Sequence, residues 1–203
     1  MIISHKHKFI FIMPPKTAGT SLFNAIKSSL NTKEFLEENT HYHLNRYQAK
    51  NNKFYPNSYR HSLLEEAIKD FPCASNYLKF SFVRNPWDLV VSFYFYELKS
   101  NIISNHITFK DFIIKKFFNT PLCIPQFNYF KDPELMTFIG KFENLQEDFN
   151  FVCDKIGIPR QKLPHDNKTN HKHYTEYYDD ETKQIVAERY ARDIEYFRYQ
   201  FGI

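Results

Sequence analysis

The 203-residue sequence lacks several features that would define its class at once. Its three cysteines are widely spaced and form no C-x-x-C pair, which argues against both a disulfide framework and a zinc site. It holds no run of about 18 apolar residues and no basic-plus-apolar signal segment, so we expect no stable membrane insertion. Together these absences favour a protein of the reducing cytoplasm.

A Walker phosphate-binding loop is also missing. That motif, G-x-x-x-x-G-K-[ST], needs a lysine directly after its second glycine. The chain has only four glycines, and Lys16 precedes Gly19 instead of following it. This absence argues against a P-loop phosphotransferase or nucleotide kinase, which stays open as an alternative that Mg²⁺ dependence would reveal.

The sequence does contain enough apolar surface for one domain. Hydrophobic residues make up 42% of the chain and aromatic residues 18%, so the chain can bury a sizeable core, and no boundary is visible. We therefore expect a single domain over residues 1–203. The net charge of +4 is mildly basic and fits an anionic ligand, although solvated surface explains most of these charges. We expect no nucleic-acid partner.

The chain is organised around Phe9–Leu30. The apolar run Phe9–Met13 ends at two prolines, which is typical of a buried strand, and from Ser21 onward apolar residues recur every four positions, which predicts a helix. The loop between them, Lys16–Ser21, leaves the first N–H groups of the helix unpaired. With the helix dipole, one lysine and three hydroxyls, it predicts a site for an oxyanion. Alternatively, Thr20 or Ser21 merely caps the helix.

A second junction of the same kind follows Leu78–Val83, another short apolar run that predicts a strand. Arg84 comes directly after it. Asn85 suits the N-cap of a helix that should run from Pro86 to about Lys99, with Asp88 completing a capping box.

Both junctions carry a cation and hydroxyls, since Ser92 lies two turns into the second helix. Two such junctions indicate a ligand with two separate anionic groups. A third strand is expected at Thr137–Phe142, closed by Glu143, whose expected role is structural. Strands that alternate with helices predict a parallel sheet in a three-layer α/β/α domain, with the ligand at the carboxyl ends of the strands.

At this point the sequence resembles a known family. PPKTAGTSL is similar to the 5′-phosphosulfate loop of sulfotransferases that use 3′-phosphoadenosine 5′-phosphosulfate (PAPS), and FSFVRNPWDLVVSFY resembles their 3′-phosphate segment. The likeness continues in FIGKFENLQEDF and in YYDDETKQIVAERYARDIEYFRYQF, so it covers nearly the whole chain. The branch it resembles is the carbohydrate sulfotransferases, which implies a P-loop NTPase-like sulfotransferase fold.

The resemblance also implies roles for individual residues. Those that would hold the 5′ phosphosulfate are Lys16, Thr17, Gly19, Thr20 and Ser21. The glycine would permit close approach of the backbone to the ligand.

Arg84 and Ser92 would hold the 3′ phosphate, which distinguishes PAPS from ATP. Lys168 and Lys172 lie in the loop that closes over the nucleotide in this family, although a polar surface loop is an alternative. Gln126 stands where the family often carries a glutamine, and we give it little weight.

The implied reaction is the transfer of a sulfuryl group from PAPS to a hydroxyl of a carbohydrate or glycolipid acceptor, which leaves 3′-phosphoadenosine 5′-phosphate (PAP). A sulfuryl group carries less charge than the phosphates of a nucleoside triphosphate, so Lys16 and N–H donors can handle it, and we expect no metal. A non-catalytic PAP-binding protein is a further alternative. Tyrosine, lipid and small-molecule acceptors also stay open.

The general base is the least defined part of the site. Some carbohydrate sulfotransferases use a carboxylate just after the phosphosulfate loop, but this chain has no acid there before Glu34. His41 and His43 resemble the His-x-His of uronyl 2-O-sulfotransferases, and a neutral imidazole can accept a hydroxyl proton near pH 7. We choose His43 as the base with His41 in support; the alternative is that both are solvated loop residues.

Overall fold

A computed structural model describes residues 1–30, 63–117, 123–163 and 171–203 of the protein. Its sheet has the order β1-β2-β3-β4. The strands are β1 (Ile2–Ser4), β2 (Phe9–Ile12), β3 (Leu78–Val83) and β4 (Phe138–Lys141). The three predicted strands, β2, β3 and β4, pair in parallel, so their carboxyl ends meet at one edge.

Strand β1 is a finding that the sequence analysis did not predict. It pairs antiparallel with β2, with Ile3 opposite Ile10, and makes the sheet mixed rather than wholly parallel. The turn between the two strands is closed by the Ser4 hydroxyl, which accepts the N–H of His7 at 3.1 Å. A three-residue strand is too short to leave a periodic signal in the sequence.

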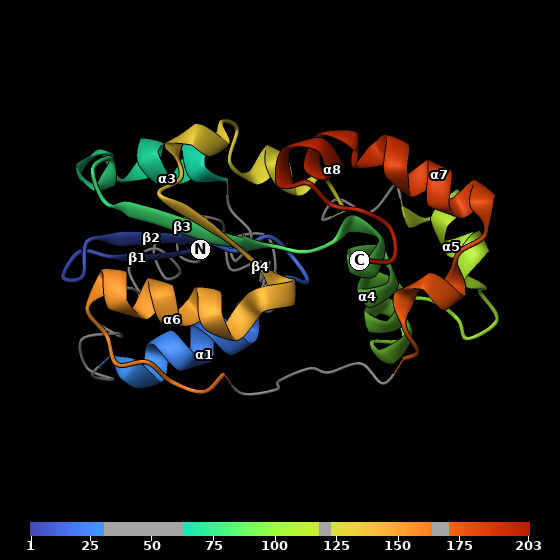
Figure 1. Ribbon diagram of the computed structural model, residues 1–203, viewed down its shortest axis with the longest axis horizontal. Coiled ribbons are helices and arrows are strands. Elements are labelled where there is room, and N and C mark those ends of the chain that lie inside the picture. Colours follow the sequence, from blue (N-terminus) through green and yellow to red (C-terminus); the bar gives the residue numbers. More distant parts are fainter. Residues whose placement is uncertain (31–62, 118–122, 164–170) are drawn as a thin grey trace, which may run out of the picture.

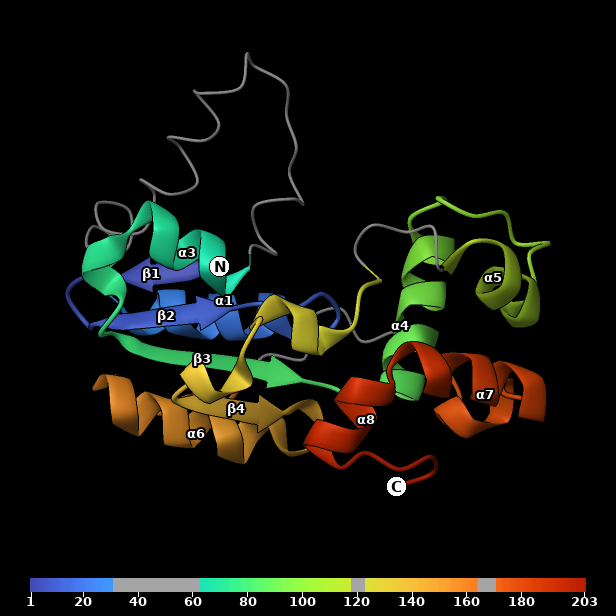
Figure 2. The same ribbon diagram turned by 90° about the horizontal axis from the view of Figure 1, so that it is seen from above.

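Helices lie on both faces of the sheet, as Figures 1 and 2 show. The α-helices are α1 (Gly19–Ser29), α3 (Leu64–Asp70), α4 (Pro86–Lys99), α5 (Phe109–Lys115), α6 (Leu145–Ile156), α7 (Asp180–Arg189) and α8 (Ala191–Phe197). Short 3₁₀ turns are η1 (Pro72–Ala74), η3 (Gln126–Tyr129), η4 (Pro133–Leu135), η5 (Phe142–Asn144) and η6 (Tyr174–Tyr177). No helix within these described ranges combines the length and apolarity needed to span a bilayer.

Alternating residues of β2 face two different cores. Phe9 and Phe11 belong to the cluster that includes residues of α1 and α6, and the Phe11 ring stacks on Phe80 with centroids 4.7 Å apart. Ile10 and Ile12 belong to the cluster on the other face, with residues of α3. Successive side chains of a strand point to opposite faces, so a strand that is apolar at every position needs cover on both sides.

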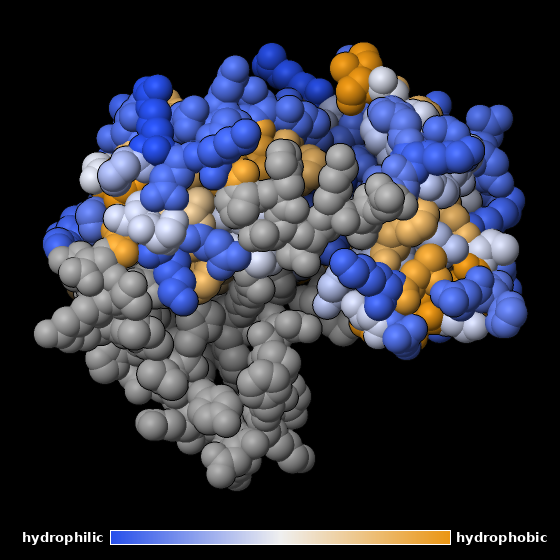
Figure 3. Space-filling view, turned by 90° about the horizontal axis from the view of Figure 1, so that it is seen from below, coloured by the Kyte–Doolittle hydropathy of each residue, from blue (hydrophilic) through white to orange (hydrophobic). Residues whose placement is uncertain are grey.

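Helices α4, α5 and α7 form a helical group beyond the carboxyl ends of β2, β3 and β4 (Figure 2). Their apolar side chains make a third core. Trp87, in the first turn of α4, is 4% exposed and meets the Phe201 ring edge-on with centroids 5.5 Å apart. Its indole N–H donates to the Lys183 carbonyl at 3.1 Å. On the face seen in Figure 3, the coloured surface is mostly hydrophilic with scattered apolar patches.

The helix starts test the predicted caps. Asn85 caps α4, since its side-chain oxygen accepts the N–H of Trp87 at 3.2 Å. The capping box with Asp88 is wrong, because the Asn85 N–H donates to Glu143 and Asp88 pairs with Arg84 instead.

Candidate active site

The loop between β2 and α1 has an unusual backbone. Lys16 and Ala18 have φ angles of 65° and 62°, in the left-handed region that residues other than glycine seldom occupy. Such conformations cost on the order of 1–3 kcal/mol each and cluster at ligand sites. The Thr17 hydroxyl donates to the Pro14 carbonyl at 2.8 Å and braces the loop from within.

Helix α1 begins at Gly19, two residues earlier than the sequence analysis placed it. Its N-cap is Ala18, whose methyl group cannot accept a hydrogen bond, and its first turn holds no acidic residue. The alternative that Thr20 or Ser21 merely caps the helix is therefore wrong, because both lie inside it. Among the residues that the structure describes, the start of α1 therefore has neither an N-cap side chain nor a first-turn acidic residue, the two features that usually stabilise a helix N-terminus.

Gly19 is not required by the fold itself. Its φ is not in the left-handed region, and a Cβ built on it would meet Met13 at an ordinary contact distance of 3.5 Å. A methyl side chain would therefore fit among the described residues. What the missing side chain leaves open is the approach to the first backbone N–H groups of α1.

Lys16 places a cation beside this helix start. Its Nζ lies 4.0 Å from the centroid of the Tyr96 ring on α4. Burial, and then the charges of Arg84 and Lys99, lower the pKa of Lys16 from 10.5 to about 8. Within the part of the chain that the structure describes, no carboxylate forms an ion pair with this ammonium. The loop therefore concentrates positive charge, which an anion would stabilise.

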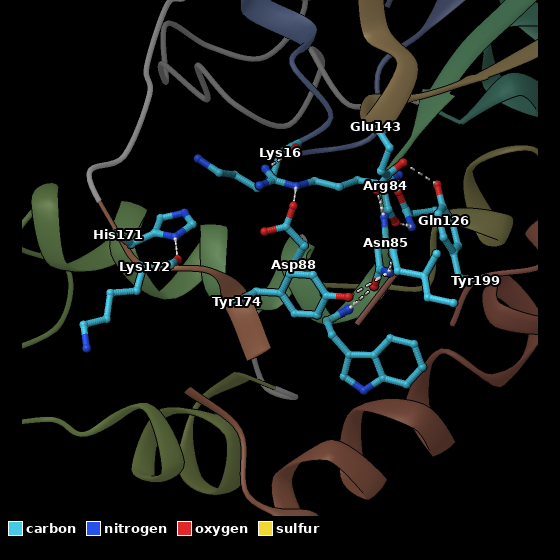
Figure 4. A network of polar contacts seen from close by, with 12 residues as sticks. Lys16, Arg84, Asn85, Asp88, Gln126, Glu143, His171, Lys172, Tyr174 and Tyr199 are labelled. Atoms are coloured by element: carbon cyan, nitrogen blue, oxygen red, sulfur yellow. Dashed lines mark hydrogen bonds and ion pairs between the residues drawn. The ribbon is translucent and has the colours of Figure 1, made fainter. Parts of the chain in front are cut away.

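Arg84 connects this loop to the second junction, at the end of β3. Its Nη1 donates to the Lys16 carbonyl at 3.2 Å, and its Nε donates to the Asp88 carboxylate at 2.8 Å. The guanidinium carbon also lies 4.0 Å from the centroid of the Phe142 ring. Figure 4 shows this side chain lying between Asp88 and the backbone of Lys16. The two predicted junctions are thus in direct contact.

Side chains from distant segments bind the backbone of this second junction. Gln126 accepts the Arg84 N–H and donates to the Arg84 carbonyl, both at 2.8 Å. Glu143 accepts the Asn85 N–H at 2.6 Å, which is the structural role expected of it. The Asn85 amide donates to the Tyr174 hydroxyl at 3.3 Å.

The other predicted site residues differ in burial and in their distance from the two junctions. Ser92 is buried on α4, on the same helical face as Asp88 and Tyr96 because these residues are four apart. Lys172 is exposed and pairs with Glu176 at 3.1 Å; Figure 4 shows its side chain directed away from Arg84. His41, His43 and Lys168 lie outside the described residues.

Two comparisons with known proteins gave matches. The model of the sulfotransferase family matches residues 1–200. An uncharacterized protein of Archaeoglobus fulgidus is 38% identical over 90 residues, which make up 42% of this chain and 72% of that protein.

Proposed function

The chain belongs to the sulfotransferase family, and from this premise we propose that it transfers a sulfuryl group from PAPS to a hydroxyl of a carbohydrate or glycolipid acceptor. The observation that carries the proposal is the contact between the two junctions, where Arg84 donates to the Lys16 carbonyl at 3.2 Å. Two cations on adjacent loops suit a ligand with anionic groups at two positions. We further propose a single cytoplasmic domain with the three-layer, P-loop-like fold of this family.

The residues present fit PAPS. At the first junction, the described residues give the start of α1 no N-cap side chain and give the charged Lys16 no ion-paired carboxylate, and a phosphosulfate would supply the negative charge. We assign Lys16, Thr17, Gly19, Thr20 and Ser21 to the 5′ phosphosulfate. Because the Thr17 hydroxyl donates within the loop, its backbone N–H is the group we expect to face the ligand.

At the second junction we assign Arg84 and Ser92 to the 3′ phosphate. A guanidinium suits phosphate because its N–H groups form a planar fork and it stays charged at every working pH. Asp88 and the Lys16 carbonyl fix the orientation of the Arg84 guanidinium in advance. This lowers the conformational entropy that the side chain loses when it binds a phosphate. We assign Lys168 and Lys172 to peripheral contacts with the phosphates.

When bound, PAPS supplies an activated sulfuryl group. In the reaction, a bond forms between the acceptor oxygen and sulfur, the bond from sulfur to the 5′ phosphate oxygen breaks, and the acceptor proton passes to a base. Lys16 would neutralise the charge that grows on the departing phosphate oxygen, with the N–H groups at the start of α1 in support. This role needs no metal, and we expect turnover to persist in EDTA.

We propose His43 as the base, with His41 in support. The imidazole would accept the hydroxyl proton, so His43→Ala should lower kcat by roughly 100-fold or more and remove the acidic limb of the pH profile. PAP affinity should stay unchanged in the same variant, which calorimetry would measure. Near-full turnover in both His41→Ala and His43→Ala would contradict the assignment and direct the search to Glu34, Glu37 and His61.

The decisive experiment measures turnover of labelled PAPS with a panel of acceptors in EDTA. Sulfation of a sugar hydroxyl without a divalent metal would support the proposal. A requirement for Mg²⁺ together with ATP turnover would favour a phosphotransferase instead. Tight PAP binding without turnover on carbohydrates, glycolipids, tyrosine peptides or small alcohols would favour a non-catalytic PAP-binding protein.

A further inference from the structure

Arg84 is the first residue after β3, where the backbone no longer pairs with β4. The last residue pair of β3 and β4 is Val83 with Lys141. At the next position, Arg84 is only 8% exposed, yet its N–H and C=O both need partners. The side-chain amide of Gln126 binds both groups at 2.8 Å. One amide side chain, with one acceptor and one donor, thus takes the place of a strand.

Gln126 is itself held by a buried carboxylate. Asp193, in α8, is fully buried and accepts the backbone N–H of Gln126 at 2.7 Å and that of Phe127 at 2.8 Å. Burial raises the pKa of Asp193, and the N–H donors of η3 act against this by stabilising the charged form. A buried carboxylate with several N–H donors fixes the turn that presents Gln126.

These contacts bear on the direction of the guanidinium. The tip of the Arg84 side chain contacts Asp88 and the Lys16 carbonyl, and the peptide groups on both sides of its Cα set the direction in which that side chain starts. Loss of the Gln126 amide would leave two buried backbone groups without these partners. Because an unsatisfied buried group is costly, the local backbone would rearrange and carry the side chain with it.

We propose that Gln126, held in place by Asp193, is the positioning residue that sets the Arg84 guanidinium for phosphate binding. The proposal rests on the proposed function, because that function assigns Arg84 to the 3′ phosphate. Gln126 acts through the backbone of Arg84 and is separated from it by 42 positions in the sequence.

The first test compares PAP with AMP, which lacks the 3′ phosphate, by calorimetry. Gln126→Met keeps the length of the side chain and removes both polar groups. We expect the preference for PAP over AMP to fall about tenfold, the lower end of what the loss of a supporting partner costs at metal sites. AMP affinity should change little. Gln184→Met is the matched control, because Gln184 is exposed on α7 and bonds only to Glu188 among the described residues.

The second test measures the exchange rate of the Arg84 backbone amide and adds the milder variant Asp193→Asn. In Gln126→Met, amide hydrogen exchange at Arg84, followed by NMR, should become faster than in the Gln184→Met control. Asp193→Asn keeps the shape of the carboxylate but turns an N–H donor toward one of the backbone N–H groups. It should shift the PAP to AMP ratio in the same direction and by less, and it serves if Gln126→Met does not fold.

The outcomes distinguish the proposed function from the positioning role of Gln126. Equal affinity for PAP and AMP in the unmodified protein would overturn the proposed function and the present inference with it. A clear preference for PAP that survives both substitutions would overturn the inference alone. Unchanged exchange at Arg84 in Gln126→Met would overturn it as well.

Discussion

The two strand-to-helix junctions at the carboxyl edge of the sheet are built in opposite ways. The junction after β2 has two residues in left-handed conformations, an N-cap without a side-chain oxygen and a lysine whose pKa is lowered to about 8. The junction after β3 has a side-chain N-cap, an arginine paired with Asp88 and a backbone bound by Gln126 and Glu143. One junction is strained and concentrates charge, and the other is stabilised by many polar contacts.

The difference suggests a division of labour between the two cations. Lysine can lose its proton when it is buried, whereas arginine stays charged in proteins. Lys16 therefore suits the group on which charge changes during a reaction, and Arg84 suits the group that stays constant. Each of the following predictions tests whether the two junctions differ in this way.

The largest effect is expected from removing the lysine. Lys16→Ala should lower kcat by roughly 100-fold or more and should weaken PAP binding much less, because the contact strengthens as charge develops on the leaving oxygen. Steady-state kinetics and calorimetry would measure the two quantities. Lys16→Arg should restore little activity.

The matched control is Lys115→Ala, which removes an exposed lysine that pairs with Asp111 on α5. It should leave kcat unchanged. Full kcat in Lys16→Ala would contradict the division of labour.

The second effect concerns the arginine. Arg84→Ala should reduce the preference for PAP over AMP by about tenfold to a hundredfold, since hydrogen bonds to charged groups contribute about 1.5–3 kcal/mol each. Unlike the lysine variant, it should act mainly on affinity. Arg160→Ala is the control, because Arg160 forms an exposed pair with Asp154 through Nε and Nη2. A preference for PAP that survives Arg84→Ala would exclude Arg84 from the 3′-phosphate site.

The third effect is a pH dependence confined to the first junction. Burial and the neighbouring cations lower the pKa of Lys16 to about 8, so its charged form predominates below that pH and is lost above it. The value of kcat/KM for PAPS, which reports on the free enzyme, should therefore fall above about pH 8, approaching tenfold per pH unit. Any activity retained by Lys16→Arg should lack this limb. A flat profile up to about pH 9.5 would show that Lys16 does not need its charge to capture PAPS.

The smallest effect is expected at Lys172. Its side chain is 74% exposed and pairs with Glu176. An exposed charge of this kind is screened by solvent, so Lys172→Ala should weaken PAP binding by less than about threefold, and added salt should remove the difference. A tenfold or larger loss, on the scale expected for Arg84, would place Lys172 in direct contact with the phosphates.

Much of the fold could be predicted from local sequence. Strands β2 and β3 were predicted because each is a short apolar run followed by breakers or a cap. The cap of α4 was also predicted, from Asn85. Strand β1 was missed because its three residues form a strand only through pairing with β2, which no local pattern encodes.

The site divides in the same way. Two parallel neighbouring strands end at the same edge of the sheet, so the sequence pattern was sufficient to bring both junctions to that edge. The hydrogen bond from Arg84 to the Lys16 carbonyl was not predicted. The side chains that hold the second junction were not predictable in this way. Asp193 reaches Gln126 across 67 positions, and only the assembled core brings them together. The one signal for Gln126 in the sequence was its place in the family pattern.

Trp87 gives the second junction an optical property that the first lacks. It is the only tryptophan of the chain, and it stands three residues after Arg84, buried against Phe201. Selective excitation of indole therefore reports on this single turn of α4, with no second emitter to subtract. Ligand titrations, stopped-flow mixing and quenching experiments can all follow the junction in the unlabelled protein.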